Sequence, residues 1–282
     1  MKVEWLSKSA IDAFRQCPKR YEFELVRRAD KAFQPIEWEI GTRVHNVINR
    51  LMKHYLEHPT FKGIIGSTKN EEWFLKSYDE ETRELKRRVQ TGQVRIVRPE
   101  KTLEDYVQFG AECLKNFTCG VLPRLANQKI LQTEGGFPPN FIIAAVKIVG
   151  KFDLVVEDKG GIHVHDWKTG KARKNDDFQG KLYYFAARHK YRSAHISDFT
   201  FYLHYLAASA DEMTQSFDFA EDSFTELVAE IAEIKGAVEA TREFLPKTSK
   251  LCHWCPYNPL CSEGRAFIAD NPLDLDESEE LV

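Results

Sequence analysis

The sequence contains no hydrophobic run long enough to cross a membrane as a helix, which takes about 20 consecutive apolar residues. Residues 1–10, MKVEWLSKSA, also lack the apolar stretch and the cleavage site of a signal peptide. We therefore expect an intracellular, cytoplasmic protein in which cysteines stay reduced. Strong net charge is absent too, since the chain carries only −3 at pH 7, which by itself gives no indication of nucleic-acid binding.

Charge is nonetheless unevenly distributed, because the end of the chain is acidic. Residues 270–282 contain no basic residue and carry the carboxylates of Asp270, Asp274, Asp276, Glu277, Glu279 and Glu280. We expect this tail to be disordered, because repelling charges and few apolar side chains favour no packed structure. A tail of this kind can bind a partner protein or shield a DNA groove, and the sequence does not decide between the two.

Four of the six cysteines lie near the two ends of the chain. Cys252, Cys255 and Cys261 fall within the proline-rich segment CHWCPYNPLC, and their spacing allows the thiolates to converge on one metal centre. The fourth ligand must come from far away, and Cys17 is the obvious candidate. In a reducing compartment metal ligation is favoured over disulfides, and such a centre would fasten the first segment to the last.

Hydrophobic periodicity divides the chain into three parts. Residues 1–130 are predicted to be mainly helical, residues 130–220 to form a sheet, and residues 221–269 to form a helix and the cysteine segment. Two capping boxes are expected at helix starts, Ser9 with Asp12 and Thr102 with Asp105. The length allows one large domain, so we expect a single domain over residues 1–269.

The middle part predicts a mixed α/β fold. The expected elements are strands at 141–149, 152–157 and 162–168, a hairpin turn at 158–161, a helix at about 176–190 and a strand at 198–206. Three strands followed by a helix and another strand indicate a mixed sheet with a crossover helix.

Three polar residues meet at the end of this predicted sheet. Asp166 and Lys168 lie two apart in a strand, so their side chains point to the same face, and Asp153 lies on the preceding strand across the hairpin. Two carboxylates and a lysine at a sheet edge suit a divalent metal ion that activates water for attack on a phosphate. Taken alone, D-x-K is more often an ion pair at a strand end.

Further residues follow in a consistent order around this motif. Gln179 and Tyr183 are four apart on the predicted helix, so they share a face and can point to one site. His45, in the segment GTRVH, lies on an amphipathic helix on the same face as Ile48 and Met52. By itself His45 is typical of a core histidine; within the series it is a candidate metal ligand, and imidazole shifts preference toward Mn²⁺.

Together these motifs resemble the RecB-like branch of the PD-(D/E)XK nuclease superfamily. The matching segments are G-x-x-x-H at 41–45, G-x-x-D at 150–153, D-W-K-T-G at 166–170, Q-x-x-x-Y at 179–183 and the split cysteine set. The chain is most similar to the iron–sulfur nucleases of that branch, which include CRISPR-adaptation and AddB-type nucleases and phage or mitochondrial exonucleases. Cys17 to Tyr21 fits their C-P-x-x-Y context, and Asp166 replaces the commoner Glu of the superfamily name, as is common in the RecB-like branch.

The resemblance implies a catalytic metal site and an iron–sulfur cluster. The ligands of Mg²⁺ or Mn²⁺ would be His45, Asp153, Asp166 and the Trp167 carbonyl. Lys168 would orient the attacking water or stabilise charge in the transition state, and Gln179 and Tyr183 would position Lys168 or the DNA strand. Glu134 would be a further acidic member. A 4Fe–4S cluster would be held by Cys17, Cys252, Cys255 and Cys261.

The cluster has an alternative, because four thiolates with a C-x-x-C element also describe structural zinc. The prolines after Cys17 and Cys255, and the wide separation of the first ligand, favour the cluster.

We therefore predict an α/β protein with a PD-(D/E)XK nuclease core, in which helices flank a mixed central sheet. A helical N-terminal part and a metal-cluster staple between the N- and C-terminal segments complete it. The predicted activity is metal-dependent hydrolysis of DNA, with exonuclease action on single-stranded ends favoured over endonuclease action. The alternatives are a non-cleaving module with structural zinc that binds DNA or protein, and a zinc-stapled metalloenzyme acting on another phosphate ester. We expect no membrane partner.

Overall fold

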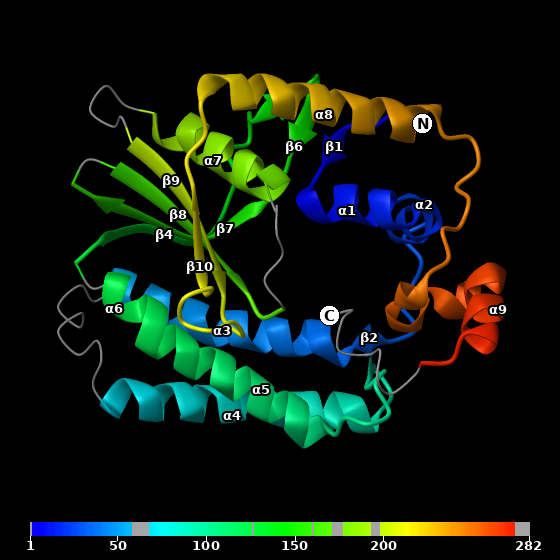
Figure 1. Cartoon of the computed structure of the whole chain (residues 1–282), viewed down its shortest axis with the longest axis horizontal. Helices are drawn as coiled ribbons and strands as arrows, with labels where there is room; N and C mark the ends of the chain where they lie inside the picture. Colours follow the sequence, from blue (N-terminus) through cyan, green and yellow to red (C-terminus); the bar gives the residue numbers. More distant parts are fainter. Residues whose placement is uncertain are drawn as a thin grey trace.

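A five-stranded sheet lies at the centre of the molecule, with helices on both of its sides (Figure 1). The computed structural model describes residues 2–57, 68–125, 127–159, 161–170, 177–192 and 198–273. The strand order is β10-β9-β8-β7-β4. The strands are β4 (Lys129–Gly136), β7 (Lys151–Asp158), β8 (Gly161–Lys168), β9 (Asp198–Tyr205) and β10 (Thr214–Phe217).

Strand directions make the sheet mixed. β7 runs antiparallel to both β4 and β8, and β10 runs antiparallel to β9, whereas β8 and β9 are parallel. A parallel pair requires a crossover connection, and α7 (Asp177–Tyr191) lies between β8 and β9 in the chain. The predicted mixed sheet with a crossover helix is confirmed. None of the helices in the described ranges is both long and apolar enough to span a membrane.

The strand expected at 141–149 is wrong in its extent and in its sheet. Its residues form a hairpin of β5 (Ile142–Ile143) and β6 (Val146–Ile148), which pairs with β1 (Trp5–Leu6) in a separate three-stranded sheet. Ala144 and Ala145, with φ of 50° and 56°, adopt the left-handed conformation that turns the chain. The sequence does not predict β4 or β10 either, because KILQTEGG and TQSF show little alternation of apolar residues.

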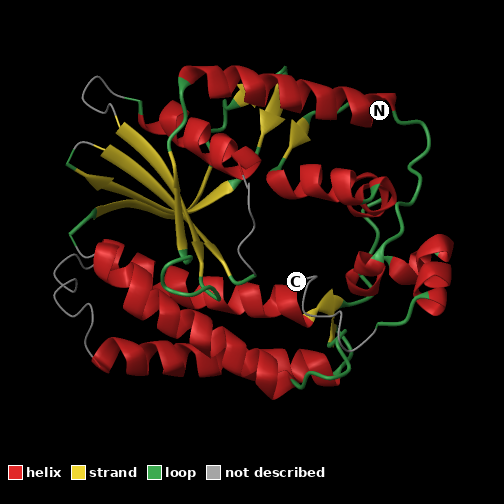
Figure 2. Ribbon diagram, in the orientation of Figure 1, coloured by secondary structure: helices red, strands yellow, loops and turns green. Residues whose placement is uncertain are grey.

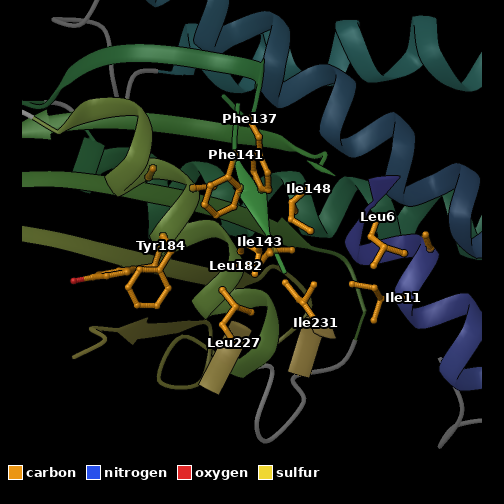
Figure 3. Packing of buried hydrophobic residues seen from close by; sticks show 14 of the residues in the cluster. Leu6, Ile11, Phe137, Phe141, Ile143, Ile148, Leu182, Tyr184, Leu227 and Ile231 are labelled. Carbon is orange, nitrogen blue, oxygen red and sulfur yellow. The ribbon is translucent and has the colours of Figure 1, made fainter. Parts of the chain in front are cut away.

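One side of the sheet is covered by α7, against which α8 (Glu221–Ala240) packs, and α1 (Lys8–Gln16) lies beyond the end of the sheet on the right of Figure 1. Figure 3 shows Leu6 and Ile11 of the N-terminal segment close to Ile231 of α8, within the same buried cluster as Ile148. Burial of these side chains fastens the N-terminal segment to the middle of the chain. The first part of the sequence is therefore not a separate helical unit.

The opposite side is covered by α3 (Ile36–Glu57), α4 (Thr68–Gln90) and α5 (Leu103–Asn116). Leu154, Val156 and Trp167 from the strands belong to the cluster buried beneath these helices. Alternation along β8 sends Trp167 to this side and Ile162 and Val164 to the other. Asp166 shares the parity of Val164, so the strand directs it toward α7.

Segments from near the two ends of the chain lie side by side next to the main body, where short helices cluster (Figure 2). Ala32 N donates to the Pro256 carbonyl at 3.1 Å, and the rings of Phe23 and Tyr257 stack with centroids 5.9 Å apart. The short elements of the molecule are α2 (Pro18–Tyr21), η1 (Glu22–Val26), β2 (Gln34–Pro35), β3 (Val94–Arg95), η3 (Phe117–Val121), α6 (Leu122–Leu125), η4 (Lys250–Trp254), η5 (Asn258–Leu260) and α9 (Ser262–Asp270).

One of the two predicted capping boxes is present in the structure. Thr102 and Asp105 form the expected box at the start of α5, with Asp105 N donating to Thr102 Oγ1 at 3.2 Å and Thr102 N donating to Asp105 Oδ2 at 2.7 Å. The box at Ser9 is wrong, because α1 begins at Lys8 and Ser7 Oγ accepts from Ala10 N.

At the other end of the chain α9 extends to Asp270, and residues 274–282 of the predicted tail lie outside the described residues.

Candidate active site

Asp166 and Lys168 lie together at the end of β8. Lys168 Nζ is 2.7 Å from Asp166 Oδ2, which confirms that both side chains project from the same face of the strand. Asp166 is only 3% exposed, whereas the Lys168 side chain is 34% exposed. The pair therefore joins a buried carboxylate to an ammonium group that water can reach.

Gln179, in the first turns of α7, holds the other oxygen of the same carboxylate. Its Nε2 donates to Asp166 Oδ1 at 3.0 Å, and the side chain is 1% exposed. Because a buried amide aligned on a carboxylate restricts its rotation, Gln179 fixes the direction of Asp166. The predicted orientation of Gln179 toward the D-x-K motif is thus found in the structure.

Asp153 of β7 lies next to this pair and links it to α3. Asp153 Oδ2 accepts a hydrogen bond from Trp167 N at 3.0 Å and lies 3.4 Å from His45 Nδ1. The structure therefore brings side chains from α3, β7, β8 and α7 together at one end of the sheet, between the α3 layer and the α7 layer. These side chains belong to His45, Asp153, Asp166, Lys168 and Gln179.

The two carboxylates differ in their electrostatic environment. Burial raises the pKa of Asp166, and the nearby Asp153 charge adds to this effect, so the pKa stays raised although Lys168 opposes it. Burial would also raise the pKa of Asp153, but the contact with His45 outweighs it and the pKa is lowered. Burial alone would lower the pKa of His45, but Asp153 outweighs it and the pKa is raised.

The donor set suits a hard or borderline divalent cation. Two carboxylates and an imidazole are ligands of Mg²⁺ and Mn²⁺, and a cation would offset the burial and the Asp153 charge, which raise the pKa of Asp166. Within the described part of the chain, however, no group of three or more His, Cys, Asp or Glu side chains is arranged to hold a metal ion. Asp166 is instead directed to Lys168 and Gln179, and Asp153 to His45 and Trp167.

Tyr183 of α7 lies among aromatic side chains. The Tyr183 ring packs against Phe137, with centroids 5.0 Å apart, and against Phe152 and Phe201 at 6.0 and 5.6 Å. It therefore belongs to an aromatic cluster under the sheet end.

Glu134 has a φ of 46°, a strained conformation for a residue other than glycine, and lies 3.8 Å from Lys151 Nζ.

A cleft of about 980 Å³ lies beside this centre. His45, Glu134 and Thr169 line it near the carboxylates, and Cys17 and Cys252 line it at the terminal segments. Its other walls include four cationic side chains and a half-buried indole: Lys8, Arg15, Arg20, Lys247 and Trp38. This volume is at the upper end of the range of roughly 300–1,000 Å³ that is typical of ligand pockets.

The four cysteines predicted to act together line one small cavity. Cys17, Cys252, Cys255 and Cys261 are all among its lining residues. Backbone N–H groups of Lys247, Ser249 and Gly264 lie 3.4, 3.5 and 3.3 Å from the sulfurs of Cys17, Cys252 and Cys261 respectively. Amide groups directed at sulfur stabilise thiolates, as ligand cysteines require.

Burial also changes the pKa of Cys255, which is one of these four cysteines. It raises the pKa of Cys255 to about 11, so this thiol is neutral near pH 7 unless a cation binds it. Cys113 is fully buried and Cys119 is exposed, and neither lines the cavity of the four.

The positions of α3 and β4 depend on residues that the sequence does not single out. Arg43 bridges Glu39 at 2.8 Å and Glu81 at 3.1 Å, which fixes α3 against α4 below His45. Thr133 Oγ1 donates to Asn49 Oδ1 at 2.8 Å and so connects β4 to α3. Arg43 lies within GTRVH, but nothing in the sequence indicates that Glu81 is its partner.

The protein thus has a mixed sheet between two helical layers, with a carboxylate–lysine site at one end of the sheet. The family model of the PD-(D/E)XK nuclease superfamily matches residues 5–262. The chain belongs to the PD-(D/E)XK nuclease superfamily. The predicted superfamily is therefore confirmed.

No curated protein matches the chain significantly. Among solved structures, the chain is similar to one described as "Putative exonuclease" from Eubacterium rectale, with 11% sequence identity, a TM-score of 0.46 and coverage of 99% of this chain and 94% of the other. At this TM-score the likeness supports no conclusion about activity.

Proposed function

We propose that the protein is a metal-dependent deoxyribonuclease that removes nucleotides from single-stranded DNA ends. One observation carries the proposal: Asp166 is buried between Lys168 and Gln179, 2.7 and 3.0 Å away, beside Asp153, and the neighbouring His45 and Thr169 line a cleft. A purely structural ion pair would not need a second, half-buried carboxylate next to it, since two such charges repel.

Each residue of the centre has a distinct role in this proposal. His45, Asp153, Asp166 and the Trp167 carbonyl would hold Mg²⁺ or Mn²⁺, which when bound supplies Lewis-acid activation of water. Lys168 places positive charge where the phosphate gains negative charge during hydrolysis. Gln179 keeps Asp166 aligned, and the Trp167 N–H keeps Asp153 aligned. Tyr183 supports the sheet end through its aromatic neighbours.

The cleft supports a single-stranded substrate. Its cationic side chains suit a phosphate backbone, and Arg20 lies over the Trp38 ring with its guanidinium carbon 5.1 Å from the centroid. Proteins that bind single strands combine such a cationic track with aromatic rings on which bases stack. A strand entering along α1 and α3 would reach Asp153 and Asp166 at the sheet end.

We further propose that Cys17, Cys252, Cys255 and Cys261 hold a 4Fe–4S cluster that staples the terminal segments. The shared cavity and the amide groups directed at sulfur support this. A zinc ion would need all four sulfurs about 2.3 Å from one point, whereas a 4Fe–4S cluster presents a separate iron to each thiolate. An intracellular location fits thiols that must stay reduced.

The test is nuclease activity of anaerobically purified protein on end-labelled single-stranded DNA, with Mn²⁺ or with EDTA. We expect shortening from an end that depends on the metal ion and is lost in the Lys168→Ala variant, while Lys115→Ala, an exposed lysine at the end of α5, serves as the matched control. Full cleavage by Lys168→Ala would contradict the proposed mechanism. Cutting of circular single strands would show endonuclease action instead.

A further inference from the structure

A second cavity lies beside the cleft and has no role in the activity described so far. Its volume is about 380 Å³, within the range of roughly 300–1,000 Å³ that is typical of ligand pockets. We call it the side pocket. Glu37, Thr169 and Gly170 line both the side pocket and the cleft, so the two spaces adjoin at these residues.

The side pocket begins one residue beyond the candidate catalytic lysine. Thr169 directly follows Lys168 at the end of β8. A Cβ atom added to Gly41 would lie 3.1 Å from Thr169 Oγ1, so α3 approaches the strand end closely at this point. A nucleotide next to a phosphate held at Asp166 and Lys168 would therefore have the side pocket as its nearest cavity on the α5 side.

One wall of the side pocket is apolar and aromatic. Phe109 of α5 is 37% exposed although it is a large hydrophobic residue, and Ile40 and Tyr106 lie beside it in the lining. Tyr106 Oη donates to Glu37 Oε1 at 2.7 Å, which fixes the wall to α3. An exposed ring on a rigid helix offers a stacking surface for a base, because every base has a π-face.

The polar lining includes groups whose hydrogen-bonding capacity is unused. Arg98 is 8% exposed, and its Nε, like Glu37 Oε2, is buried without a hydrogen-bond partner among the residues that the structure describes. Buried polar groups are normally paired, so an unpaired donor and an unpaired acceptor beside one pocket point to a polar ligand. Lys101 adds an exposed cation to the lining, suited to a phosphate.

We propose that the side pocket is a subsite for the unpaired nucleotide adjacent to the scissile phosphate. Its base stacks on Phe109, the polar edge of the base meets Glu37, and its flanking phosphate meets Lys101. The proposal rests on the proposed nuclease function, because it takes the cut to occur at Asp166 and Lys168. It explains why an exposed aromatic ring and two unpaired polar atoms occur together one residue beyond the catalytic lysine.

The test is the equilibrium binding of fluorescent single-stranded oligonucleotides in EDTA, in which the wild-type protein does not cut. One set of strands is intact, and in a second set each strand lacks the base at one position. We expect Phe109→Ala to weaken binding of the intact strand roughly tenfold, the scale of one lost base–aromatic stack. It should leave unchanged the affinity for the one abasic strand whose gap falls at the side pocket.

Controls separate the subsite from general effects. Leu75→Ala removes a large exposed apolar side chain from α4, away from both cavities, and should change neither affinity. Lys101→Ala should weaken binding to intact and abasic strands alike, since it contacts a phosphate, and Lys115→Ala should not.

The outcomes distinguish the two proposals. If the wild type binds and shortens single strands but Phe109→Ala binds the intact and abasic strands as the wild type does, the subsite is overturned and the nuclease function stands. If a free deoxynucleoside monophosphate binds in a Phe109-dependent manner while strand affinity is unaffected by Phe109→Ala, the pocket holds a released product and the strand subsite is also overturned. A wild-type protein that neither binds nor cuts DNA overturns the proposed function itself.

Discussion

Gln179 on α7 donates a 3.0 Å hydrogen bond to Asp166 on β8, and both side chains are almost completely buried. The bond joins the crossover helix to the strand that it follows in the chain. It also leaves the second oxygen of Asp166 to Lys168, whose side chain is 34% exposed. The orientation of the carboxylate is thus set by the fold before any substrate binds, which reduces the reorganisation that catalysis requires.

Replacing Gln179 with Ala should lower nuclease activity without unfolding the protein. Asp166 would lose one fixed partner in a buried position, which costs about 1–3 kcal/mol of unfolding free energy. We expect kcat to fall roughly 10- to 100-fold, the usual effect of losing a residue that orients a metal ligand, and KM for DNA to change little. Urea unfolding and single-turnover kinetics would measure the two effects. Gln108→Ala, at an exposed position on α5, is the control, and unchanged kcat in Gln179→Ala would refute the positioning role.

The two carboxylates should respond oppositely to neutralisation. The pKa of Asp166 is raised, chiefly by burial, so its charged form destabilises the metal-free fold at pH 7, and Asp166→Asn should increase the free energy of unfolding. Burial opposes the charge of Asp153 as well, but His45 outweighs it and the pKa is lowered, so Asp153→Asn should decrease that free energy. Denaturant unfolding at pH 7 in EDTA tests both. Destabilisation by both substitutions to the same degree would contradict the difference in electrostatic environment.

Much of the centre can be predicted from the sequence because short-range periodicity sets it. The two-residue period of β8 fixes Asp166 and Lys168 on one face, and the helical position of Gln179 after a crossover connection directs it to the same strand. The hairpin between β7 and β8 brings Asp153 next to Trp167. These relationships depend on neighbours in the chain, so residue order is enough to infer them.

Other features depend on segments far apart in the sequence. Tyr183 has the expected spacing from Gln179, yet its surroundings are determined by Phe137 and Phe152, which no local pattern associates with it. The side pocket is similar, because α3, α5 and the end of β8 each contribute part of its lining and none of these segments carries a recognisable motif for it. Only tertiary packing brings such residues together.

The cysteine site offers a test that is independent of nuclease activity. Cys252→Ser should abolish the visible absorbance of anaerobically purified protein, because one ligand of the proposed cluster is lost. It should also lower the melting temperature by more than about 5 °C, since the terminal segments would no longer be joined. Cys119→Ser, which changes an exposed cysteine outside the set, should alter neither property. A colourless wild-type protein that contains zinc would rule out the cluster and support a structural zinc site.

A buried histidine pair predicts how stability depends on pH. His165 Nδ1 lies 2.9 Å from His204 Nε2, both side chains are buried, and His204 Nδ1 lies 3.0 Å from Thr214 Oγ1. Burial lowers the pKa of His204 from 6.5 to about 3, so the unfolded chain binds a proton in this interval that the folded protein does not. The contribution of His204 to stability is therefore complete above pH 6.5 and is lost as pH falls toward 3.

We expect the free energy of unfolding of the wild type to fall by up to about 1.4 kcal/mol per pH unit for His204 alone in the region below pH 6. The His204→Asn variant should be less stable at pH 7, because it disrupts a packed pair, but its stability should depend less on pH between 5 and 6.5. Urea unfolding across this range measures the slope. His189→Asn, at an exposed histidine on α7, is the matched control and should keep the wild-type slope. Equal slopes for His204→Asn and the wild type would show that His204 takes up its proton in the folded protein.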